Sequence, residues 1–464
     1  MQAPQLGKEA PQPGKEAPLL EKYGAARLPR YTSYPTAPLF SPAVDARQYG
    51  DWLSALAPGT RSALYLHIPF CRAMCWYCGC HTSITLRDQP VEDYLSVLRA
   101  EIALVAARAG DRAVIDDVHF GGGTPTIMAA ESFLRLMDRL RRHLAFHRDT
   151  AIAVEIDPRT LTREMAFALG EAGVRRASLG VQSFDVAVQQ AINRMQSPER
   201  TAGAIADLRA AGVTGINIDL IYGLPHQTER SAVETAHTAA AMRPDRLAVF
   251  GYAHVPSFKK HQRLIDESAL PDARQRDAQA EAIAATLAQA GYRRIGLDHY
   301  ALPDDPLAVA QAAGRLRRNF QGYTTDASEA LIGLGASAIG RMPQGFVQNE
   351  VATGAYARRV MAGEPATVRG YRLTADDRLR ADVIERLMCD FSADLDAIGR
   401  THGVDAGFLL RGNGRLDALR DDGAVEIDGA VIRVHRDRRF IVRAVAACFD
   451  AYLDGGGRTH GQAA

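Results

Sequence analysis

Short apolar runs alternate with longer helical stretches over residues 63–252, and this alternation limits the possible folds more than any other feature. The stretch 91–109, for example, has apolar residues at helical spacing, whereas the run 117–120 has the length of a strand. Strands that are separated by helices form parallel sheets. We therefore predict an α/β fold whose six strands cover residues 63–67, 117–120, 151–156, 177–181, 215–222 and 246–252.

The chemically informative residues lie at the carboxyl ends of these strands. They are a cysteine-rich loop, the glycine loop 121–124, Glu155, Gln182, Asp219 and Ala253. Functional groups gather at the carboxyl ends of strands in α/β barrels and in open α/β sheets alike. The pattern therefore predicts one site at this edge of the sheet, but it does not distinguish a closed barrel from an open one.

Four of the six cysteines lie within ten residues, at Cys71, Cys75, Cys78 and Cys80. This spacing is too tight for a disulfide framework, and it lacks the distant second pair of ligands that a structural zinc site usually has. Thiolates are the ligands of iron–sulfur clusters. The first three cysteines are enough for three irons of a cubane, and the open fourth iron is typical of a catalytic centre. A structural zinc site or a set of buried thiols is the alternative interpretation.

The composition indicates an ordinary globular protein. Hydrophobic residues make up 47% and charged residues 23% of the 464 residues, and the net charge is +1. Such a chain has no global field that attracts nucleic acid or a membrane, and it contains no long apolar run. We expect a cytoplasmic protein, since a reducing compartment suits exposed thiolates. Nothing in the sequence indicates more than a monomer.

The alternation of strands and helices stops near Tyr371. Residues 375–390, 395–401 and 406–409 have helical patterns, and residues 425–433 read as two short strands around an Asp-Gly turn. Helices followed by a hairpin indicate a small, mostly helical, winged-helix-like domain. A lid over the site suits it better than DNA binding, because no strong basic face accompanies it.

Several motifs occur in an order that resembles one family of the radical S-adenosylmethionine (radical-SAM) superfamily. They are RYTSYPT (30–36), YLHIPF (65–70), the cysteine loop ending in CGC (78–80), GGGTPT (121–126), EIDP (155–158), GVQSF (180–184), NIDLIYGLP (217–225) and NFQGYTT (319–325). Together they are similar to the oxygen-independent coproporphyrinogen III oxidases (coproporphyrinogen dehydrogenases) of haem biosynthesis. The resemblance covers about residues 23–453, nearly the whole chain.

The resemblance implies a partial (β/α)6 radical-SAM barrel and a 4Fe-4S cluster. It assigns Cys71, Cys75 and Cys78 to the cluster and leaves the fourth iron to S-adenosylmethionine. A fourth thiolate would close the cluster, and the family has the Cys80 position without using it as a ligand. Cys80 is therefore a candidate catalytic residue, and an inert neighbour is the alternative.

The resemblance also implies two bound molecules of S-adenosylmethionine. Contacts of the molecule on the cluster are implied for Tyr65, Tyr77, Gly122, Glu155 and Ile339. Contacts of a second molecule are implied for Gly123, Thr124, Gln182, Arg194, Asp219 and Ala253. The family more often has phenylalanine at position 77, where a tyrosine ring still suits a cover for adenine. Without the resemblance, Glu155 and Asp219 would each be interpreted more often as a solvated carboxylate in a turn.

The implied reaction converts two propionates of coproporphyrinogen III to vinyl groups, which gives protoporphyrinogen IX. A reduced cluster passes an electron to S-adenosylmethionine, and the resulting 5′-deoxyadenosyl radical removes a hydrogen from a propionate β-carbon. The electron comes from a low-potential donor protein that the sequence does not identify. One alternative is a haem chaperone of the same fold, which lacks the Cys80 position and the full 30–36 segment. Another is a haem-degrading or tetrapyrrole-methylating relative.

Two basic clusters, at 259–263 and 315–318, are candidates for holding the carboxylates of the tetrapyrrole, since arginine forks suit carboxylates. The alternative interpretation of both clusters is a solvated surface.

The sequence patterns and the family resemblance together divide the chain into five expected segments. They are a disordered tail at 1–22, where GKEAP occurs twice, an N-terminal segment near the active site at 23–55, a catalytic barrel with extensions at 56–369, a C-terminal helical domain at 370–454, and a second disordered tail at 455–464.

Overall fold

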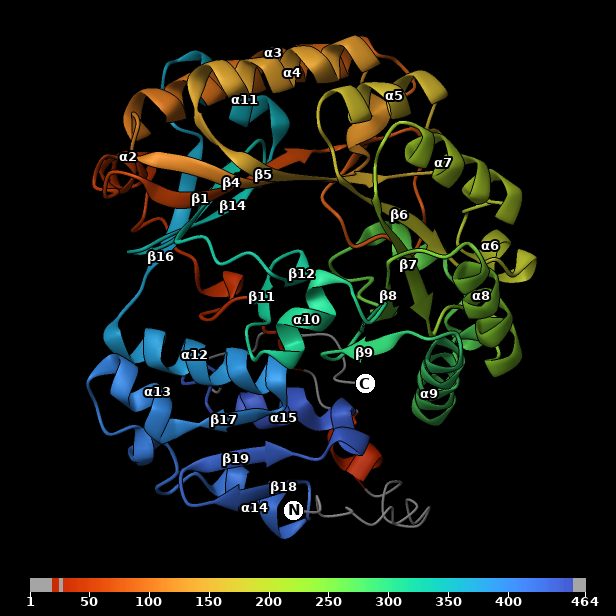
Figure 1. Cartoon of the computed structure of the whole chain (residues 1–464), viewed down its shortest axis with the longest axis vertical. Coiled ribbons are helices and arrows are strands. Elements are labelled where there is room, and N and C mark those ends of the chain that lie inside the picture. The colour runs from red at the N-terminus through yellow and green to blue at the C-terminus, as the bar shows by residue number, and fades with distance from the viewer. Residues whose placement is uncertain (1–18, 25–27, 454–464) are drawn as a thin grey trace, which may run out of the picture.

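The alternating elements form one large mixed sheet in the computed structural model, which describes residues 19–24 and 28–453 (Figure 1). Within these residues twelve strands lie in the order β16-β15-β14-β13-β1-β4-β5-β6-β7-β8-β10-β9. The neighbours from β13 to β8 run parallel. Their bounds are β1 Thr60–Ile68, β4 Ala113–Gly122, β5 Ala145–Ile156, β6 Arg176–Gln182, β7 Gly215–Tyr222, β8 Arg246–Gly251 and β13 Ala330–Leu334.

Helices cover the outer face of this sheet (Figure 1). Those that connect the parallel strands are α3 Gln89–Ala109, α4 Ala130–His143, α5 Arg163–Glu171, α6 Val186–Ala191, α7 Pro198–Ala210 and α8 Glu229–Ala241. Leu64, Leu66 and Ile68 of β1 are fully buried, as are Leu95 and Leu98 of α3. Burial of each such side chain contributes roughly 1.5–3 kcal/mol. The sheet and its helices therefore form a rigid frame for the residues at the strand ends.

The sheet does not close on itself, since no pairing among the described strands joins β1 to β8. Antiparallel strands extend its two edges: β10 His299–Ala301 and β9 Arg293–Ile295 beside β8, and β14 Ile339–Met342, β15 Gly345–Asn349 and β16 Thr367–Arg372 beside β13. The predicted α/β fold with six parallel strands is confirmed, and β13 adds a seventh that the sequence analysis does not predict. The barrel is open and partial.

Most predicted boundaries agree with the structure within a few residues. Thr162 caps α5, because its hydroxyl accepts a hydrogen bond from the Met165 N–H at 3.1 Å. The strand predicted at 117–120 is too short, however, since β4 continues to Gly122. The reason is that Gly121 and Gly122 pair with the end of β1, a tertiary interaction that glycine content does not reveal.

The C-terminal part has a hydrophobic core of its own (Figure 1, blue). It contains α12 Ala375–Asp390, β17 Ser392–Asp394, α13 Leu395–His402, α14 Gly414–Asp421, β18 Val425–Asp428, β19 Val431–Val434 and α15 Val442–Ala447. The helix at 375–390 and the hairpin at 425–433 are confirmed, whereas residues 406–409 form only a 3₁₀ turn. The sequence analysis misses β17, α14 and α15 because elements this short show no clear period.

The N-terminal segment divides between the two cores. Tyr31 packs in the C-terminal core and donates a hydrogen bond to Asp450 at 3.0 Å, and Tyr34 accepts one from the Ala451 N–H at 3.0 Å. The helix α2 Ala46–Ser54 packs instead against the helices of the sheet. The segment therefore spans the distance between the C-terminal part and the barrel.

The predicted tails and boundaries need one correction. Leu19 lies in the predicted tail, yet it is buried in the C-terminal core, because apolar residues there cover it. Residues 20–22 of the predicted tail are ordered as well, since they belong to a short π-helix, Leu20–Gly24. The rest of the two predicted tails, residues 1–18 and 455–464, lies outside the described residues. We propose that the barrel ends after β16, at 373–374, since β16 belongs to the large sheet.

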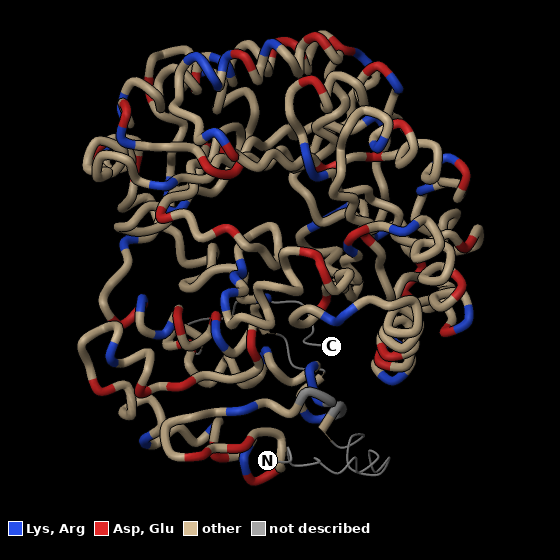
Figure 2. Tube along the Cα trace, in the orientation of Figure 1, with Lys and Arg blue, Asp and Glu red and all other residues tan. Residues whose placement is uncertain are grey.

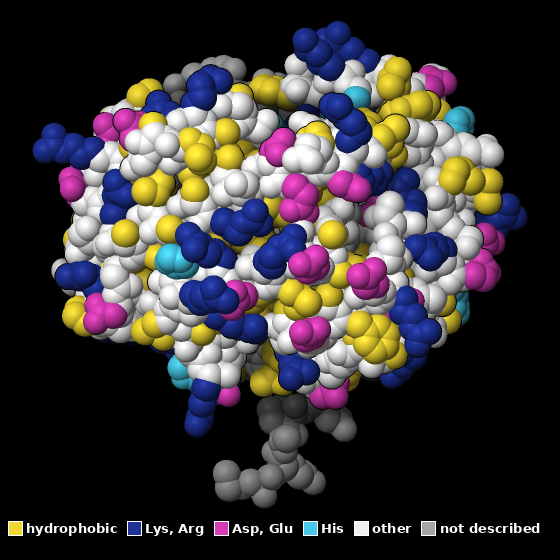
Figure 3. Space-filling model, turned by 90° about the horizontal axis from the view of Figure 1, so that it is seen from above, with side chains coloured by type: hydrophobic (Ala, Val, Ile, Leu, Met, Phe, Trp, Pro, Cys, Tyr) yellow, Lys and Arg dark blue, Asp and Glu magenta, His cyan; other side chains and the backbone are white. Residues whose placement is uncertain are grey.

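Charges of both signs occur together on one face of the molecule. The face seen in Figure 3 mixes Lys and Arg with Asp and Glu and with scattered hydrophobic side chains. This mixture agrees with the net charge of +1. Among the described residues, no helix combines the length and the apolar character needed to cross a bilayer.

A buried carboxyl group gives the fold a predicted pH dependence. Glu101 of α3 accepts hydrogen bonds from the Gly335 N–H, the Asn349 side chain and the Tyr356 hydroxyl at 2.6, 2.7 and 2.8 Å. Burial raises the pKa of Glu101 from 4.5 to about 7. The unfolded chain releases this proton near pH 4.5 and the folded chain keeps it to about pH 7. The free energy of unfolding should therefore fall as pH rises through this window.

Denaturant unfolding of the parent and of Glu101→Gln at several pH values checks this prediction. The variant should be less stable overall, because an amide cannot accept from all three donors. Its free energy of unfolding should not show the additional fall between pH 4.5 and about 7 that Glu101 causes in the parent. Parallel slopes for the two proteins would contradict the assignment of the slope to Glu101.

Candidate active site

The cysteine loop leaves the sheet at the carboxyl end of β1 and is held to the glycine loop that follows β4. The Ile68 carbonyl accepts a hydrogen bond from the Gly123 N–H, and the Phe70 carbonyl accepts one from the Thr124 N–H, both at 2.8 Å. Two short parallel strands, β2 Phe70–Cys71 and β3 Ser83–Ile84, pair within the loop. The backbone therefore brings together two motifs that are far apart in the sequence.

A cavity of about 390 Å³ lies at these loops and at the strand ends. All four motif cysteines line it, as do nine of the eleven predicted cofactor contacts: Tyr77, Gly122, Gly123, Thr124, Glu155, Gln182, Arg194, Asp219 and Ala253. Tyr65 and Ile339 do not line it. The Tyr65 hydroxyl lies 3.0 Å from Nδ1 of His67, and Ile339 begins β14. We call this space the cysteine cavity.

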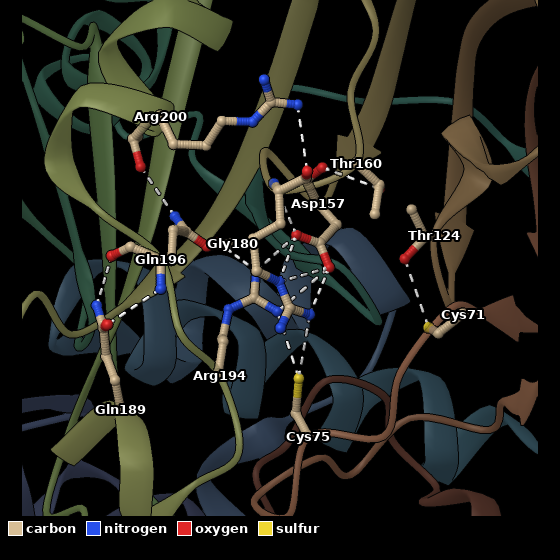
Figure 4. Close-up of polar contacts among 12 residues, drawn as sticks. Cys71, Cys75, Thr124, Asp157, Thr160, Gly180, Gln189, Arg194, Gln196 and Arg200 are labelled. Carbon is tan, nitrogen blue, oxygen red and sulfur yellow. Dashed lines mark hydrogen bonds and ion pairs between the residues drawn. The ribbon is translucent and has the colours of Figure 1, made fainter. Parts of the chain in front are cut away.

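Side-chain donors surround the sulfur atoms of Cys71 and Cys75 (Figure 4). Cys71 Sγ accepts hydrogen bonds from the Thr82 and Thr124 hydroxyls at 3.3 and 3.4 Å. Cys75 Sγ accepts one from the Arg194 guanidinium at 3.4 Å. Hydrogen bonds to sulfur stabilise thiolates and tune the reduction potential of iron–sulfur clusters. These donors therefore suit metal-ligating thiolates better than inert buried thiols.

Cys78 and Cys80 interact with each other. The Cys80 N–H donates to Cys78 Sγ at 3.3 Å. Hydrogen bonds from the thiol and the backbone of Cys80 outweigh burial and lower the pKa of Cys78 to about 6, while the pKa of Cys80 is raised. The thiol of Cys78 therefore ionises more readily than the thiol of Cys80.

The chemistry of the donor set fits an iron–sulfur cluster. All six cysteines are free thiols, and four of them line one cavity. In the part of the chain that the structure describes, no three Cys, His, Asp or Glu side chains are already arranged around one metal position. The fit therefore rests on the shared cavity and on the donors to the sulfur atoms.

Gly122 and Gly123 are required for the close approach of the two loops. Gly122 has a φ of +113°, and a Cβ at this position would lie 2.7 Å from the His67 ring. A Cβ at Gly123 would lie 2.5 Å from the Phe70 carbonyl oxygen. Only glycine fits where backbone approaches this closely, so the contact between the two loops requires these glycines.

Two carboxylates at strand ends line the cysteine cavity. Glu155 accepts a hydrogen bond from the Gly122 N–H at 3.2 Å. Asp219 accepts hydrogen bonds from Ser178 and Asn217 at 2.9 and 2.7 Å, and burial raises its pKa to about 6. Both are tied to neighbouring donors, unlike solvated turn carboxylates, and their oxygens are suitable acceptors for the hydroxyl or ammonium groups of a ligand.

An ion-pair network beside Cys75 includes two residues that the sequence analysis does not predict. Asp157, which follows β5, pairs with Arg194 at 3.3 Å (Figure 4). It also pairs with Arg159 at 2.6 Å. Burial opposes ionisation of Asp157, but the two arginines outweigh it and lower the pKa of Asp157. Asp157 lies in the EIDP motif at a strand end, which is a usable signal. No comparable signal marks Arg159.

The basic cluster at 259–263 holds the cysteine loop. Three of its side chains donate hydrogen bonds to carbonyl oxygens of that loop: Lys259 to Cys80, His261 to Cys78 and Gln262 to Tyr77, at 3.0, 2.7 and 2.9 Å. Interpreting these side chains as a solvated surface is therefore wrong. Their contacts indicate that they position the cysteine loop, and a role of the cluster in holding carboxylates stays a prediction.

We predict that Gln262→Ala loosens the cysteine loop. Gln262 is 1% exposed, and its side chain bonds the carbonyls of Tyr77 and Ala253 and the N–H of Val255. Leaving a buried group without its partner costs about 1–3 kcal/mol. The thermal midpoint should fall by a few degrees, and less iron should be retained after desalting of reconstituted protein.

The exposed neighbour Lys260 provides the matched control, because Lys260→Ala removes a cation from the same segment without changing the loop contacts. It should match the parent in midpoint and in retained iron. A Gln262→Ala protein that also matched the parent in both measurements would contradict the positioning role.

The second basic cluster, at 315–318, lies between the sheet and the C-terminal part. Arg317 pairs with Glu385 of α12 at 2.7 Å. The Arg318 side chain is only 5% exposed, and its guanidinium lies over the Tyr323 ring at 4.5 Å. A solvated surface is therefore the wrong description of Arg318, which lines a small internal cavity.

A parallel α/β sheet with a Cys-x3-Cys-x2-Cys loop after its first strand is the arrangement of radical S-adenosylmethionine proteins. The model of the Radical SAM superfamily matches residues 65–239, which carry the cysteine loop, the glycine loop and the ends of β4 to β7.

Comparison over the full length identifies the family within this superfamily. The oxygen-independent coproporphyrinogen III oxidase of Bradyrhizobium diazoefficiens is 58% identical over 445 residues, 96% of this chain and 99% of the relative. That of Escherichia coli K12 is 40% identical over 440 residues, 94% of this chain and 95% of the relative. This chain belongs to the family of oxygen-independent coproporphyrinogen III oxidases.

A solved structure supports the same conclusion for the fold. Coproporphyrinogen III oxidase from Escherichia coli, a radical SAM enzyme, matches with a TM-score of 0.87 at 39% identity over 91% of this chain and 98% of the other. The predicted radical-SAM fold class is therefore confirmed.

Proposed function

We propose that this protein catalyses the oxygen-independent oxidative decarboxylation of coproporphyrinogen III to protoporphyrinogen IX, in which two propionates become vinyl groups. The observation that carries the proposal is the cysteine cavity, where four thiols, the glycine loop and two carboxylates meet. Relatives that match almost the whole chain are named oxidases of this substrate. The protein would then be an oxidoreductase of porphyrin and haem biosynthesis.

We place a 4Fe-4S cluster on Cys71, Cys75 and Cys78, with S-adenosylmethionine on the fourth iron. When bound, the cluster supplies the electron that cleaves the sulfonium and so provides the radical for hydrogen removal from the substrate. The hydroxyl and guanidinium donors stabilise the thiolates. Cys80 stays a candidate catalytic residue, because it lines the cavity without belonging to the three-thiolate set.

We also propose that two molecules of S-adenosylmethionine bind together, with Tyr65, Tyr77 and Ile339 among the contacts of the first. Support comes from the two separate acceptors, Glu155 at the glycine loop and Asp219 on β7. A further cavity of about 580 Å³ is lined by both of these residues, so it adjoins the cysteine cavity. The combined space suits a second cofactor and a bulky substrate.

The proposed reaction also needs an electron source and an electron acceptor, because the substrate radical left after hydrogen removal loses carbon dioxide and one electron to become a vinyl group. We infer a low-potential donor protein, because the cluster has to be reduced before it cleaves S-adenosylmethionine. We further propose a monomer in the cytoplasm. The six free thiols support a reducing compartment.

An anaerobic assay tests the proposed function. Protein reconstituted with iron and sulfide is given dithionite, S-adenosylmethionine and coproporphyrinogen III, and the oxidised products are separated by chromatography. Protoporphyrin should appear with two equivalents of carbon dioxide and of 5′-deoxyadenosine. Haem binding without any turnover would overturn the proposal in favour of a haem chaperone.

A further inference from the structure

A small cavity lies where the ends of β7 and β8 meet the N-terminal segment and the C-terminal part. Its volume is about 100 Å³, which is room for one carboxylate group but not for a tetrapyrrole. Five arginines line it, against three acidic residues: Arg30, Arg276, Arg294, Arg318 and Arg443, against Asp277, Glu281 and Asp298. Lys and Arg positions recur in the middle of the trace, between its upper and lower parts (Figure 2). We call this space the arginine cavity.

Arg318 is a buried cation whose charge is poorly satisfied. Its side chain is 5% exposed, and its nearest acidic oxygen, Oδ2 of Asp298, is 3.9 Å away. Asp298 also bonds the His299 ring at 2.7 Å, so its charge is shared. Among the described atoms, Nε and Nη1 of Arg318 have no hydrogen-bond partner. A buried guanidinium with unused donors is costly, and an anion that accepts from these donors offsets the cost.

The neighbouring arginines add positive charge at the same place. Arg443 donates to the carbonyls of Leu28 and Pro29, the second at 3.0 Å, and so fixes the chain that presents Arg30. Burial, together with the charges of Arg30 and Arg318, lowers the pKa of Arg443 to about 10. Mutual repulsion of this kind disappears when an anion binds between the cations.

The arginine cavity adjoins the cysteine cavity. Arg30 and residues 250–253 line both of them. A ligand that places one carboxylate among the arginines therefore extends past the end of β8 toward the thiols.

We propose that the arginine cavity is the subsite that anchors one propionate of the tetrapyrrole, with Arg318 and Arg30 as its carboxylate ligands. This inference rests on the proposed function. Cationic partners stabilise an ionised carboxylate and oppose its loss as neutral carbon dioxide. The propionate held here is therefore one that the product retains, while a propionate to be decarboxylated lies in the cysteine cavity.

S-adenosylmethionine also carries a carboxylate, so the test separates two sources of the same chemistry. Binding of coproporphyrin III, the stable oxidised form of the substrate, is followed by fluorescence for the parent and for Arg318→Met. Binding of S-adenosylmethionine is measured on the same reconstituted proteins. Arg318→Met should weaken coproporphyrin III binding about ten- to a hundredfold, as loss of a charge-assisted bond predicts, and leave S-adenosylmethionine binding unchanged.

Arg317→Met is the matched control, because Arg317 is the adjacent arginine, pairs with Glu385 and does not line the arginine cavity. It should bind coproporphyrin III like the parent. Arg318→Lys should recover part of the affinity, since it restores the charge without the fork. If Arg318→Met does not fold, Arg30→Met carries the test, because Arg30 is exposed and its loss should also weaken porphyrin binding.

Three outcomes would overturn the subsite. They are unchanged coproporphyrin III binding in Arg318→Met, an equal loss in Arg317→Met, and a loss confined to S-adenosylmethionine. A parent that binds coproporphyrin III but shows no turnover contradicts the proposed function, whereas a parent with turnover and an unaffected variant contradicts the subsite alone.

Discussion

Replacing Cys71, Cys75 or Cys78 with alanine should remove the cluster and, with it, all cleavage of S-adenosylmethionine. A three-thiolate site has no spare ligand, and even changes to residues that only contact metal ligands cost about 10–100-fold in affinity or activity. Iron and sulfide analysis after anaerobic reconstitution should therefore show almost no bound cluster in each variant. The production of 5′-deoxyadenosine should fall at least about a hundredfold.

Cys80→Ser separates the ligands from their neighbour. The serine keeps the backbone N–H that bonds Cys78 Sγ, so iron and sulfide should stay close to the parent amounts while decarboxylation is lost. Cys448→Ser, outside the cysteine loop, controls for loss of a thiol as such. Equal loss of iron from all four loop variants would show that Cys80 is a ligand and that the three-thiolate assignment is wrong.

Asp219→Ala should reduce the number of bound S-adenosylmethionine molecules from two to one. The substitution removes a buried acceptor in the C-terminal half of β7, which should weaken one site by roughly 1–3 kcal/mol. The site on the open iron should remain, because it depends on the cysteines. Equilibrium binding under anaerobic conditions measures both stoichiometries, and a parent that saturates at one equivalent would refute the second site.

The pH dependence of binding of the second S-adenosylmethionine molecule provides an independent check of the second site. The pKa of Asp219 is raised to about 6 by burial, so the carboxyl group is neutral below this pH and ionised above it. Binding of a cationic ligand should therefore weaken as pH falls through about 6. Asp219→Asn keeps the shape of the side chain and should abolish this dependence, whereas Ser178→Ala, which removes one donor to the carboxylate, should shift it to higher pH.

Much of the site can be predicted from local sequence. Cysteine spacing specifies a set of thiolate ligands because the ligands lie in one short loop. The alternation of runs and helical stretches specifies parallel strands, and parallel strands place their carboxyl ends at one edge. Glu155, Gln182 and Asp219 therefore line the same cavity although they are far apart in the chain. Tyr65 and Ile339, which do not line that cavity, are predicted from the family resemblance and not from this argument.

Other features depend on contacts between distant segments. The basic run at 259–263 is indistinguishable from a solvated surface until its side chains are seen on the carbonyls of the cysteine loop. Arg318 and Arg317 are neighbours in sequence, yet one is buried at a cavity and the other pairs with Glu385 of α12. Charge patterns record composition along the chain, whereas burial depends on what packs against each side chain.

The ligand type, the parallel direction of the strands and the edge of the sheet that carries the site follow from the sequence, because each depends on spacing along a short stretch of chain. The open barrel, the hold on the cysteine loop and the arginine cavity follow from packing. In each of them, groups from three or more distant segments meet. Burial and the interaction of charges that lie close together in three dimensions determine the free energy of these contacts. No local pattern in the sequence encodes it.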